Sequence, residues 1–356
     1  MKGLILSGGR GTRLRPITHT SAKQLVPVAN KPILFYGIEA IRDAGITDIG
    51  IVVGETHKEI RAAVGDGSRW GVEVSYIEQP DPLGLAHAVL VSEEYLGTDE
   101  FVMYLGDNLI MAGLKELVAS FRERRPNSQI LLARVPNPNQ FGVAELEGDR
   151  IVRLEEKPKT PRSDLALVGV YMFDRHVFEA ARSIKPSARG ELEITDAIQW
   201  LIDHGRRVDP TIVTGWWKDT GKLEDMLEAN RMVLDRLAER REDGVEVDAR
   251  SEIQFKVVLE QGSRIINSRV QGPAIIGRNT TIVNSYVGPF TSIHYGCRVE
   301  NSEIEHSIVL EESSVLDIGH RIADSLVGKG VTISRAERKP RVLRFMLGDH
   351  SVVGVL

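Results

Sequence analysis

A six-residue rhythm in the last third of the chain constrains the fold more than any other feature of the sequence. Between about residues 257 and 333, a small aliphatic residue recurs every six positions and is followed by glycine and small polar residues. The clearest repeats are residues 276–281, 287–292, 293–298 and 327–332. This pattern is typical of a β-helix, in which each short strand buries one aliphatic side chain inside a triangular coil. The rhythm is imperfect over residues 300–313, so it does not define the number of coils.

The part of the chain before about residue 221 has a different pattern, in which short apolar runs alternate with amphipathic helical stretches. We expect an antiparallel hairpin over residues 142–147 and 151–155. Buried strands are predicted over residues 3–6, 49–53, 74–77, 101–105 and 130–133, and helices over residues 33–44 and 114–125. This alternation predicts a Rossmann-like α/β fold with a mixed, mostly parallel sheet.

A charged helical stretch over residues 223–241 separates the two patterns. We therefore expect an α/β domain over residues 1–241 and a left-handed β-helix domain of hexapeptide repeats over residues 242–356.

The loop after the first expected strand is suited to binding phosphate. It contains Gly8, Gly9 and Gly11, followed by Thr12 and Arg13. Glycines leave backbone amides unhindered, and an arginine adds positive charge. The spacing fits neither a Walker loop nor a dinucleotide-binding turn, and a simple tight turn is the alternative reading. A second cation ten residues further on, Lys23, favours the phosphate reading.

Two aspartates follow expected strands in distant parts of the chain. Asp107 and Asn108 come directly after residues 101–105, and Asp219 lies in the run Trp217-Lys218-Asp219-Thr220-Gly221. Side chains at the carboxyl ends of strands line the crevice where open α/β sheets bind ligands. Two carboxylates can hold one Mg²⁺ against phosphate oxygens. For Asp107 and Asn108 alone, a turn is the simpler explanation.

Two further segments contain groups suited to a sugar phosphate and to a base. Lys157 follows Glu156 at the end of an expected strand, although a surface ion pair is the ordinary reading of such a dipeptide. Gln79 and Gly84 could contact a pyrimidine edge, although the same residues also form a helix N-terminus.

Together these motifs resemble the sugar-1-phosphate nucleotidylyltransferases. The resemblance rests on Gly-Gly-x-Gly-Thr-Arg-Leu at residues 8–14 and on Lys23-Gln24-Leu25-Val26-Pro27-Val28, and it is dense over residues 1–230. It is closest to the long glucose-1-phosphate thymidylyltransferases that carry hexapeptide repeats. It implies transfer of a nucleotidyl group from dTTP to glucose 1-phosphate, with Mg²⁺, giving dTDP-glucose and pyrophosphate. A UTP-using relative, a relative with another sugar 1-phosphate and a non-catalytic regulatory subunit are the alternatives.

The resemblance also implies a role for each matching residue. Arg13, Lys23, Asp107 and Lys157 are expected to be catalytic, and Asp107 and Asp219 to bind the metal. The expected nucleotide-binding residues are Leu6, Gly8, Gly9, Gly11, Thr12, Arg13, Gln24, Gln79 and Gly84. The expected sugar-phosphate-binding residues are Asn108, Gly142, Glu156, Lys157, Val168 and Tyr171, with Arg189 a weaker candidate. Because the catalytic set is intact, the enzyme reading is favoured over the regulatory subunit.

Composition narrows the remaining possibilities. A net charge of −5 argues against a nucleic-acid partner. The sequence contains no run of eighteen apolar residues, which argues against a membrane-spanning protein. The single cysteine, Cys297, fits a reducing compartment, and we expect a cytoplasmic protein that forms a homo-oligomer. The lone His294 and the small number of repeats argue against an acetyltransferase, so the β-helix is expected to serve oligomerisation or regulation.

Overall fold

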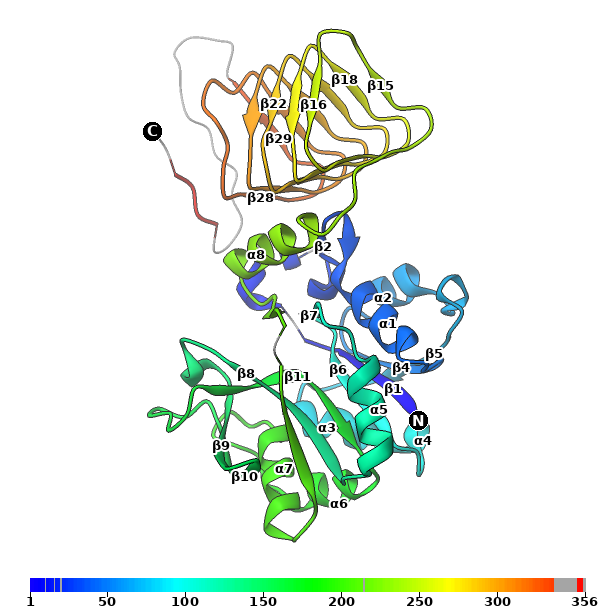
Figure 1. The fold of residues 1–356 in the computed structure, drawn as a ribbon, viewed down its shortest axis with the longest axis vertical. Coiled ribbons are helices and arrows are strands. Elements are labelled where there is room, and N and C mark those ends of the chain that lie inside the picture. Colours follow the sequence, from blue (N-terminus) through cyan, green and yellow to red (C-terminus); the bar gives the residue numbers. More distant parts are fainter. Residues whose placement is uncertain (10, 16, 20, 214, 336–350, 355–356) are drawn as a thin grey trace. The chain divides into compact units, whose positions relative to one another are not determined.

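A computed structural model describes residues 1–9, 11–15, 17–19, 21–213, 215–335 and 351–354 (Figure 1). The chain divides into two compact units. The first contains Met1–Arg10, Ser21–Leu25 and Ile33–Asp219, and the second contains Gly11–Thr20, Val26–Pro32 and Thr220–Leu356. Two short segments from the beginning of the chain therefore belong with its last third. The domain boundary after residue 241 stays a prediction, because compact units need not coincide with domains that fold independently.

A mixed β-sheet forms the centre of the first unit, which confirms the predicted α/β class. Its strands follow the order β10-β9-β11-β6-β1-β4-β5, with β8 beside β11 and β12 beside β8. The strands β1, β4, β5 and β6 are parallel to one another, whereas β11 is antiparallel to β6. Their bounds are β1 Lys2–Ser7, β4 Asp48–Val53, β5 Glu73–Glu78, β6 Phe101–Leu105, β8 Ser128–Arg134, β9 Gly142–Glu147, β10 Arg150–Glu156, β11 Leu165–Phe173 and β12 Val208–Ile212.

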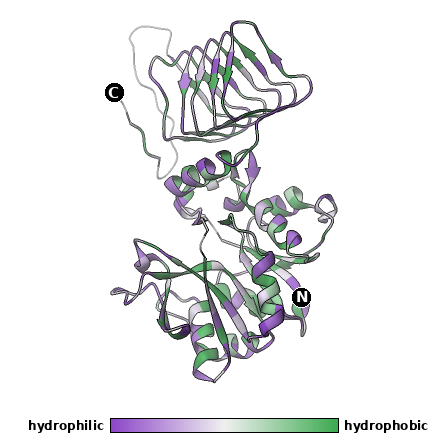
Figure 2. Cartoon of the chain, in the orientation of Figure 1, coloured by the Kyte–Doolittle hydropathy of each residue, from purple (hydrophilic) through white to green (hydrophobic). Residues whose placement is uncertain are grey.

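Helices cover both faces of this sheet, and alternate strand residues point to opposite faces. Leu4 and Leu6 pack in the cluster formed with α3, α6 and α7, whereas Ile5 packs in the cluster formed with α1, α2 and α5. Figure 2 shows hydrophobic residues along the strands and a mixture of hydrophobic and hydrophilic residues on the helices. The bounds are α1 Ile33–Asp43, α2 His57–Val64, α3 Leu85–Val91, α4 Glu93–Leu96, α5 Lys115–Arg124, α6 His176–Ser183 and α7 Ile194–Asp203.

Several short strands and 3-10 helices (η) connect the larger elements, and some of them carry predicted site residues. The antiparallel pair β7 and β13 joins Asn108–Ile110 to Trp217–Asp219. In the second unit, β2 and β3 form a small hairpin. The bounds are β2 Pro27–Val28, β3 Lys31–Pro32, η1 Thr12–Leu14, η2 Ile17–His19, η3 Lys23–Leu25, η4 Ser68–Trp70 and η5 Pro138–Gln140.

The second unit contains parallel coils whose short strands stack into three sheets (Figure 1). This arrangement confirms the predicted β-helix. The three stacks follow the orders β14-β17-β20-β23-β26-β28, β15-β18-β21-β24-β27-β29 and β16-β19-β22-β25. The bounds are β14 Arg240–Arg241, β15 Glu246–Val247, β16 Glu252–Gln254, β17 Val257–Leu259, β18 Arg264–Ile266, β19 Arg269–Gln271, β20 Ala274–Ile276, β21 Thr281–Val283, β22 Tyr286–Val287, β23 Thr291–Ile293, β24 Arg298–Glu300, β25 Glu303–Ile304, β26 Ile308–Val309, β27 Ser314–Leu316, β28 Leu326–Val327 and β29 Thr332–Ser334.

The buried aliphatic residues of the coils explain why the sequence rhythm is imperfect. Ile276 and Ile282 keep the six-residue spacing, whereas Val287 follows Ile282 after only five residues. The step from Val299 to Ile304, one coil further on, is also five residues long. These two shorter steps fall on the same side of the triangle, and Val287 pairs with Ile304 in the sheet. Consecutive coils therefore stay in register although the spacing varies.

Helix α8 spans Leu223–Leu234, so the prediction of a helix as far as residue 241 is wrong. The residues that follow have good helix propensity, but Arg240 and Arg241 pair with Val258 and Leu259 in the first β-helix sheet. Long-range strand pairing therefore overrides local propensity here.

Candidate active site

The turn between β6 and β7 brings three predicted site residues together in the first unit. The Lys23 ammonium pairs with Asp107 Oδ2, and both side chains are largely buried. Asn108 Nδ2 donates a hydrogen bond of 3.0 Å to Asp107 Oδ1. Each Asp107 oxygen thus has a partner of its own, which holds the carboxylate in one orientation.

Asp107 remains ionised in this setting. Burial alone would raise its pKa, but the Lys23 ammonium and the Asn108 amide hold the pKa below its usual value. The result is a carboxylate that stays charged at neutral pH although it is shielded from water.

The second predicted metal ligand lies on the adjoining strand. Asp219 is the register partner of Asn108 in the β7–β13 ladder, so it lies opposite the residue that directly follows Asp107. Among the described residues, no group of three or more His, Cys, Asp or Glu side chains could hold a metal by itself. A pair of aspartates fits Mg²⁺, which takes few protein ligands and completes its shell with water and phosphate oxygens.

Trp217 fixes the orientation of the Asn108 amide, a contact that the sequence motif alone did not assign. The Trp217 indole Nε1–H donates to Asn108 Oδ1 at 2.6 Å, which leaves Nδ2 directed at Asp107. The indole also makes an edge contact with Phe141. Gly169 lies against the same amide, because a Cβ there would lie 2.6 Å from Asn108 Oδ1.

The predicted base-reading residues lie beside the glycine-rich loop. Gln79 Nε2 contacts the carbonyl oxygen of Gly84 at 3.2 Å and His87 Nδ1 at 3.0 Å. A Cβ on Gly8 would lie 3.2 Å from Gln79 Oε1, so the amide oxygen faces the loop. This amide orientation follows from the hydrogen-bond network. Gly9 lies next to Gln24, which is 2% exposed.

Gly84 has a backbone reason to be glycine. Its φ of 105° is one that other residues rarely adopt, and a Cβ would lie 2.5 Å from the Leu192 carbonyl oxygen. The functional and structural readings of this position are therefore compatible.

Gly11, Thr12 and Arg13 belong to the second unit. Gly11 has a left-handed conformation and precedes η1, where Thr12 and Arg13 are exposed. The Arg13 guanidinium lies against Gly221, since a Cβ on Gly221 would be 2.8 Å from Arg13 Nη2. An exposed arginine of this kind is available to an anionic ligand.

Glu156 ends β10 and lies in a polar cluster. It accepts hydrogen bonds from Arg189 at 3.1 Å and from Thr195 Oγ1 at 3.2 Å, and Lys157 Nζ is 3.5 Å away. Burial raises the Glu156 pKa, and the neighbouring Lys157 opposes that increase. Gly142 pairs with Glu156 in the sheet, where a larger residue would collide with Thr195.

Three of the predicted contact residues have their side chains in the hydrophobic core. Leu6 and Tyr171 pack in one sheet-face cluster and Val168 in the other. Burial raises the Tyr171 pKa well above its usual value. These residues could touch a ligand only through their backbone groups, and for Leu6 the carbonyl already accepts from Gly106 N–H at 2.9 Å.

Trp217 stands in the run that ends at Gly221, but that motif gave it no role in orienting Asn108, and Gly169 had no predicted role at all. His87 was missed altogether. The available signal for Trp217 was its position two residues before Asp219, a candidate metal ligand. The sequence gives no such signal for His87, because its contact with Gln79 depends on where α3 begins.

The profile of the nucleotidyl transferase family matches residues 2–236. The chain belongs to the nucleotidyl transferase family. The match includes the loop with Arg13, the Lys23–Asp107 pair and the strand with Asp219, while the strands of the β-helix, which begin at Arg240, lie beyond it.

Several nucleotidyl transferases resemble the chain over most of its length. The glucose-1-phosphate thymidylyltransferase of Streptomyces griseus is 58% identical over 99% of this chain and 98% of its own. That of Streptomyces antibioticus is 56% identical over 100% and 99%. A Bacillus anthracis structure assigned as a glucose-1-phosphate thymidylyltransferase and solved with sucrose is 38% identical, with a TM-score of 0.62, over 65% of this chain and 94% of that one.

Because the relatives from Streptomyces align along the whole chain, the resemblance includes the β-helix as well as the α/β part. Enzymes of the nucleotidyl transferase family act on small molecules and generally depend on a divalent metal ion. No helix in the described part of the chain is long and apolar enough to cross a membrane.

Proposed function

We propose that this protein transfers a thymidylyl group from dTTP to glucose 1-phosphate, giving dTDP-glucose and pyrophosphate. The observation that carries the reaction class is the buried Lys23–Asp107 pair with Asp219 on the adjoining strand. The full-length likeness to thymidylyltransferases supports the choice of substrates.

In this reaction an oxygen of the sugar 1-phosphate attacks the α-phosphorus of the nucleotide. A new P–O bond forms, and the bond to the β-phosphate oxygen breaks as pyrophosphate leaves. Both reactants are anions, so the main tasks are charge neutralisation and alignment. We assign Arg13 and Lys23 to the triphosphate, and Lys157 to the incoming sugar phosphate. The ionised Asp107 fits a metal-ligand role, with Asp219 as its partner.

Mg²⁺ held by these two aspartates would polarise the α-phosphoryl group. The remaining steps use groups of the chain itself. Glu156, with a lysine and an arginine beside it, has carboxylate oxygens suited to accept hydrogen bonds from sugar hydroxyls.

The Gln79 amide supports a thymine or uracil base. Because Nε2 lies within hydrogen-bond distance of the Gly84 carbonyl oxygen and of His87 Nδ1, Oε1 is the group left to contact a base. An amide oxygen can accept from the N3–H of thymine or uracil, whereas N3 of cytosine is itself an acceptor and would repel it.

The test is a matrix of nucleoside triphosphates against sugar 1-phosphates, scored by pyrophosphate release in the presence of Mg²⁺. We expect the highest kcat/KM for dTTP with glucose 1-phosphate, and kcat/KM for CTP lower by about 10² or more, since a mismatched acceptor leaves buried polar groups unpaired. No pyrophosphate release with any pair would refute the proposal.

Trp217→Phe is expected to lower kcat about tenfold, because Asn108 loses the donor that keeps its Nδ2 directed at Asp107. Steady-state kinetics measure the change. Trp200→Phe is the matched control, since Trp200 stacks on His204 on a helix of the same unit. Equal kcat values for the two variants would rule out an orienting role for Trp217.

The homo-oligomer and the cytoplasmic location stay predictions. Light scattering of the purified protein tests the first.

A further inference from the structure

The hairpin that follows Lys23–Leu25 is held by hydrogen bonds within the second unit. Its turn residues, Ala29 and Asn30, both have left-handed backbone conformations. The Ala29 N–H donates to Asn230 Oδ1 at 2.8 Å, and Asn30 Nδ2 donates to the carbonyl oxygen of Ile293 at 2.9 Å. One bond runs to helix α8 and the other to strand β23 of the β-helix.

Asn230 joins the same three elements from the side of α8. It is fully buried, and its Oδ1 also accepts from Ser292 Oγ at 2.6 Å. Its Nδ2 donates to the Phe290 carbonyl oxygen at 3.0 Å. A buried amide with bonds at both ends is costly to displace, so the hairpin, the helix and the coil are fastened to one another.

The loop that carries Arg13 belongs to this same compact unit. A Cβ on Gly328, in the last part of the β-helix, would lie 4.0 Å from Cγ1 of Ile17, which follows Arg13 in the same segment. Hence the Arg13 loop and the hairpin immediately after Lys23 both pack with the β-helix.

We propose that the β-helix positions the triphosphate-binding segments, with Asn30 and Asn230 as the positioning residues. This inference rests on the proposed function, since it assigns Arg13 and Lys23 to the phosphates. We assign neither asparagine a contact with a substrate. Each acts by holding a backbone segment whose neighbours bind the triphosphate.

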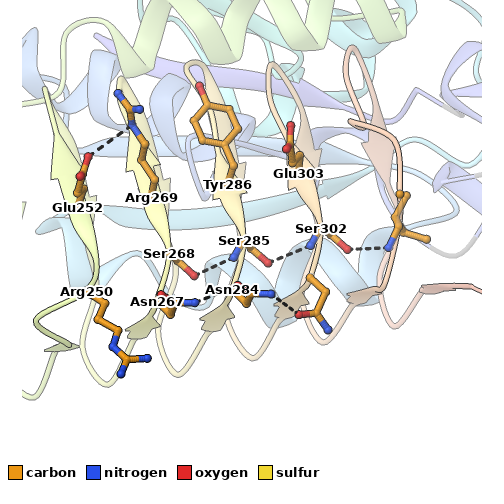
Figure 3. A pocket seen from close by; sticks show the side chains of 13 residues that line it. Arg250, Glu252, Asn267, Ser268, Arg269, Asn284, Ser285, Tyr286, Ser302 and Glu303 are labelled. Atoms are coloured by element: carbon orange, nitrogen blue, oxygen red, sulfur yellow. Dashed lines mark hydrogen bonds and ion pairs between the residues drawn. The ribbon is translucent and has the colours of Figure 1, made fainter.

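The corners of the β-helix supply a matched control. Asn267, Asn284 and Asn301 are also left-handed asparagines, and they form a ladder along one groove of about 580 Å³ (Figure 3). Asn267 Nδ2 donates to Asn284 Oδ1 at 3.0 Å, and Asn284 Nδ2 donates to Asn301 Oδ1 at 2.7 Å. Asn267→Gly therefore removes one side-chain donor at a left-handed position, as Asn30→Gly does, without altering the hairpin.

The experiment compares Asn30→Gly and Asn267→Gly in the full chain. Glycine tolerates both backbone conformations, so folding should survive. For Asn30→Gly we expect the KM for the nucleoside triphosphate to rise about fivefold, the factor that one lost hydrogen bond typically gives, with the KM for the sugar 1-phosphate unchanged. Asn267→Gly should leave both KM values as in the wild type and should shift the melting temperature about as much as Asn30→Gly does.

Equal kinetics for Asn30→Gly and the wild type would overturn the inference, as would an equal rise in both KM values. Ser292→Ala provides a second route if Asn30→Gly folds poorly, since it removes one bond to Asn230 and should raise the same KM by a smaller factor. Wild-type turnover keeps the two proposals distinct. An inactive wild type overturns the proposed function and this inference together, whereas an active wild type with unchanged variants overturns the inference alone.

Discussion

Asp107→Asn is expected to reduce kcat by about 10²–10³, the typical effect of removing one preorganised electrostatic contact. The variant keeps the shape of the side chain and its place beside Asn108, but it leaves the Lys23 ammonium without its carboxylate. It also removes one of the two proposed metal ligands. Pyrophosphate release with dTTP and glucose 1-phosphate measures the loss.

Stability is the necessary control for this variant, because breaking a buried ion pair leaves an uncompensated charge. Asp48→Asn makes the same change in another aspartate that pairs with a lysine, Lys2. Asp48 begins strand β4, whereas Asp107 follows the end of strand β6. We expect both variants to remain folded in thermal melts and only Asp107→Asn to lose turnover. An Asp107→Asn enzyme with near-normal kcat would remove the central residue of the proposed site.

Asp107→Asn also provides a readout other than activity. Binding of Mn²⁺ in place of Mg²⁺, followed by the electron paramagnetic resonance of the free ion, should weaken in this variant and stay unchanged in Asp48→Asn, because a carboxamide is a poorer ligand than a carboxylate for a hard cation.

Arg13→Ala is expected to have a kinetic effect of the same size, a loss of about 10²–10³ in kcat/KM, with almost no change in melting temperature. The difference in stability follows from burial. Arg13 is exposed and lies against Gly221, so its removal creates no buried cavity and no buried charge. Activity should fall because the triphosphate and the leaving pyrophosphate lose a bidentate cation.

Arg13→Lys separates charge from geometry. It keeps the cation but lacks the planar fork, so its activity should fall between that of the wild type and that of Arg13→Ala. Arg250→Ala, at an exposed arginine of the β-helix groove, is the matched control and should have wild-type kinetics. If Arg13→Ala behaved like Arg250→Ala, the loop would have no part in handling the triphosphate.

Much of the fold was predictable because it depends on local patterns. The strand β4 and the helix α1 agree with their expected ranges to within a residue, since period and apolar content are properties of a short window. The end of α8 was not predictable in this way. Residues after Leu234 favour a helix, and only pairing with a strand of the next coil explains why they leave it.

In the candidate site, too, some residues were predictable from local patterns and others were not. Gly8, Lys23 and Asp107 stand out in the sequence because a glycine-rich loop, a nearby cation and a carboxylate after a strand together indicate phosphate binding. The contact between Trp217 and Asn108 joins residues 109 apart, and it required the antiparallel pairing of β7 and β13. A short window of sequence does not indicate which distant strand will pair with it.

The sequence by itself determined the alternation of strands and helices, the β-helix and the residue types that can bind a triphosphate. Tertiary structure alone decided that Gly11–Thr20 and Val26–Pro32 pack with the β-helix and that Asn230 fastens the hairpin to it. The physical reason is that hydrophobic periodicity and turn chemistry act between near neighbours. A hydrogen bond between residues 201 apart forms only when the strand order of the sheets and the register of the coils are established.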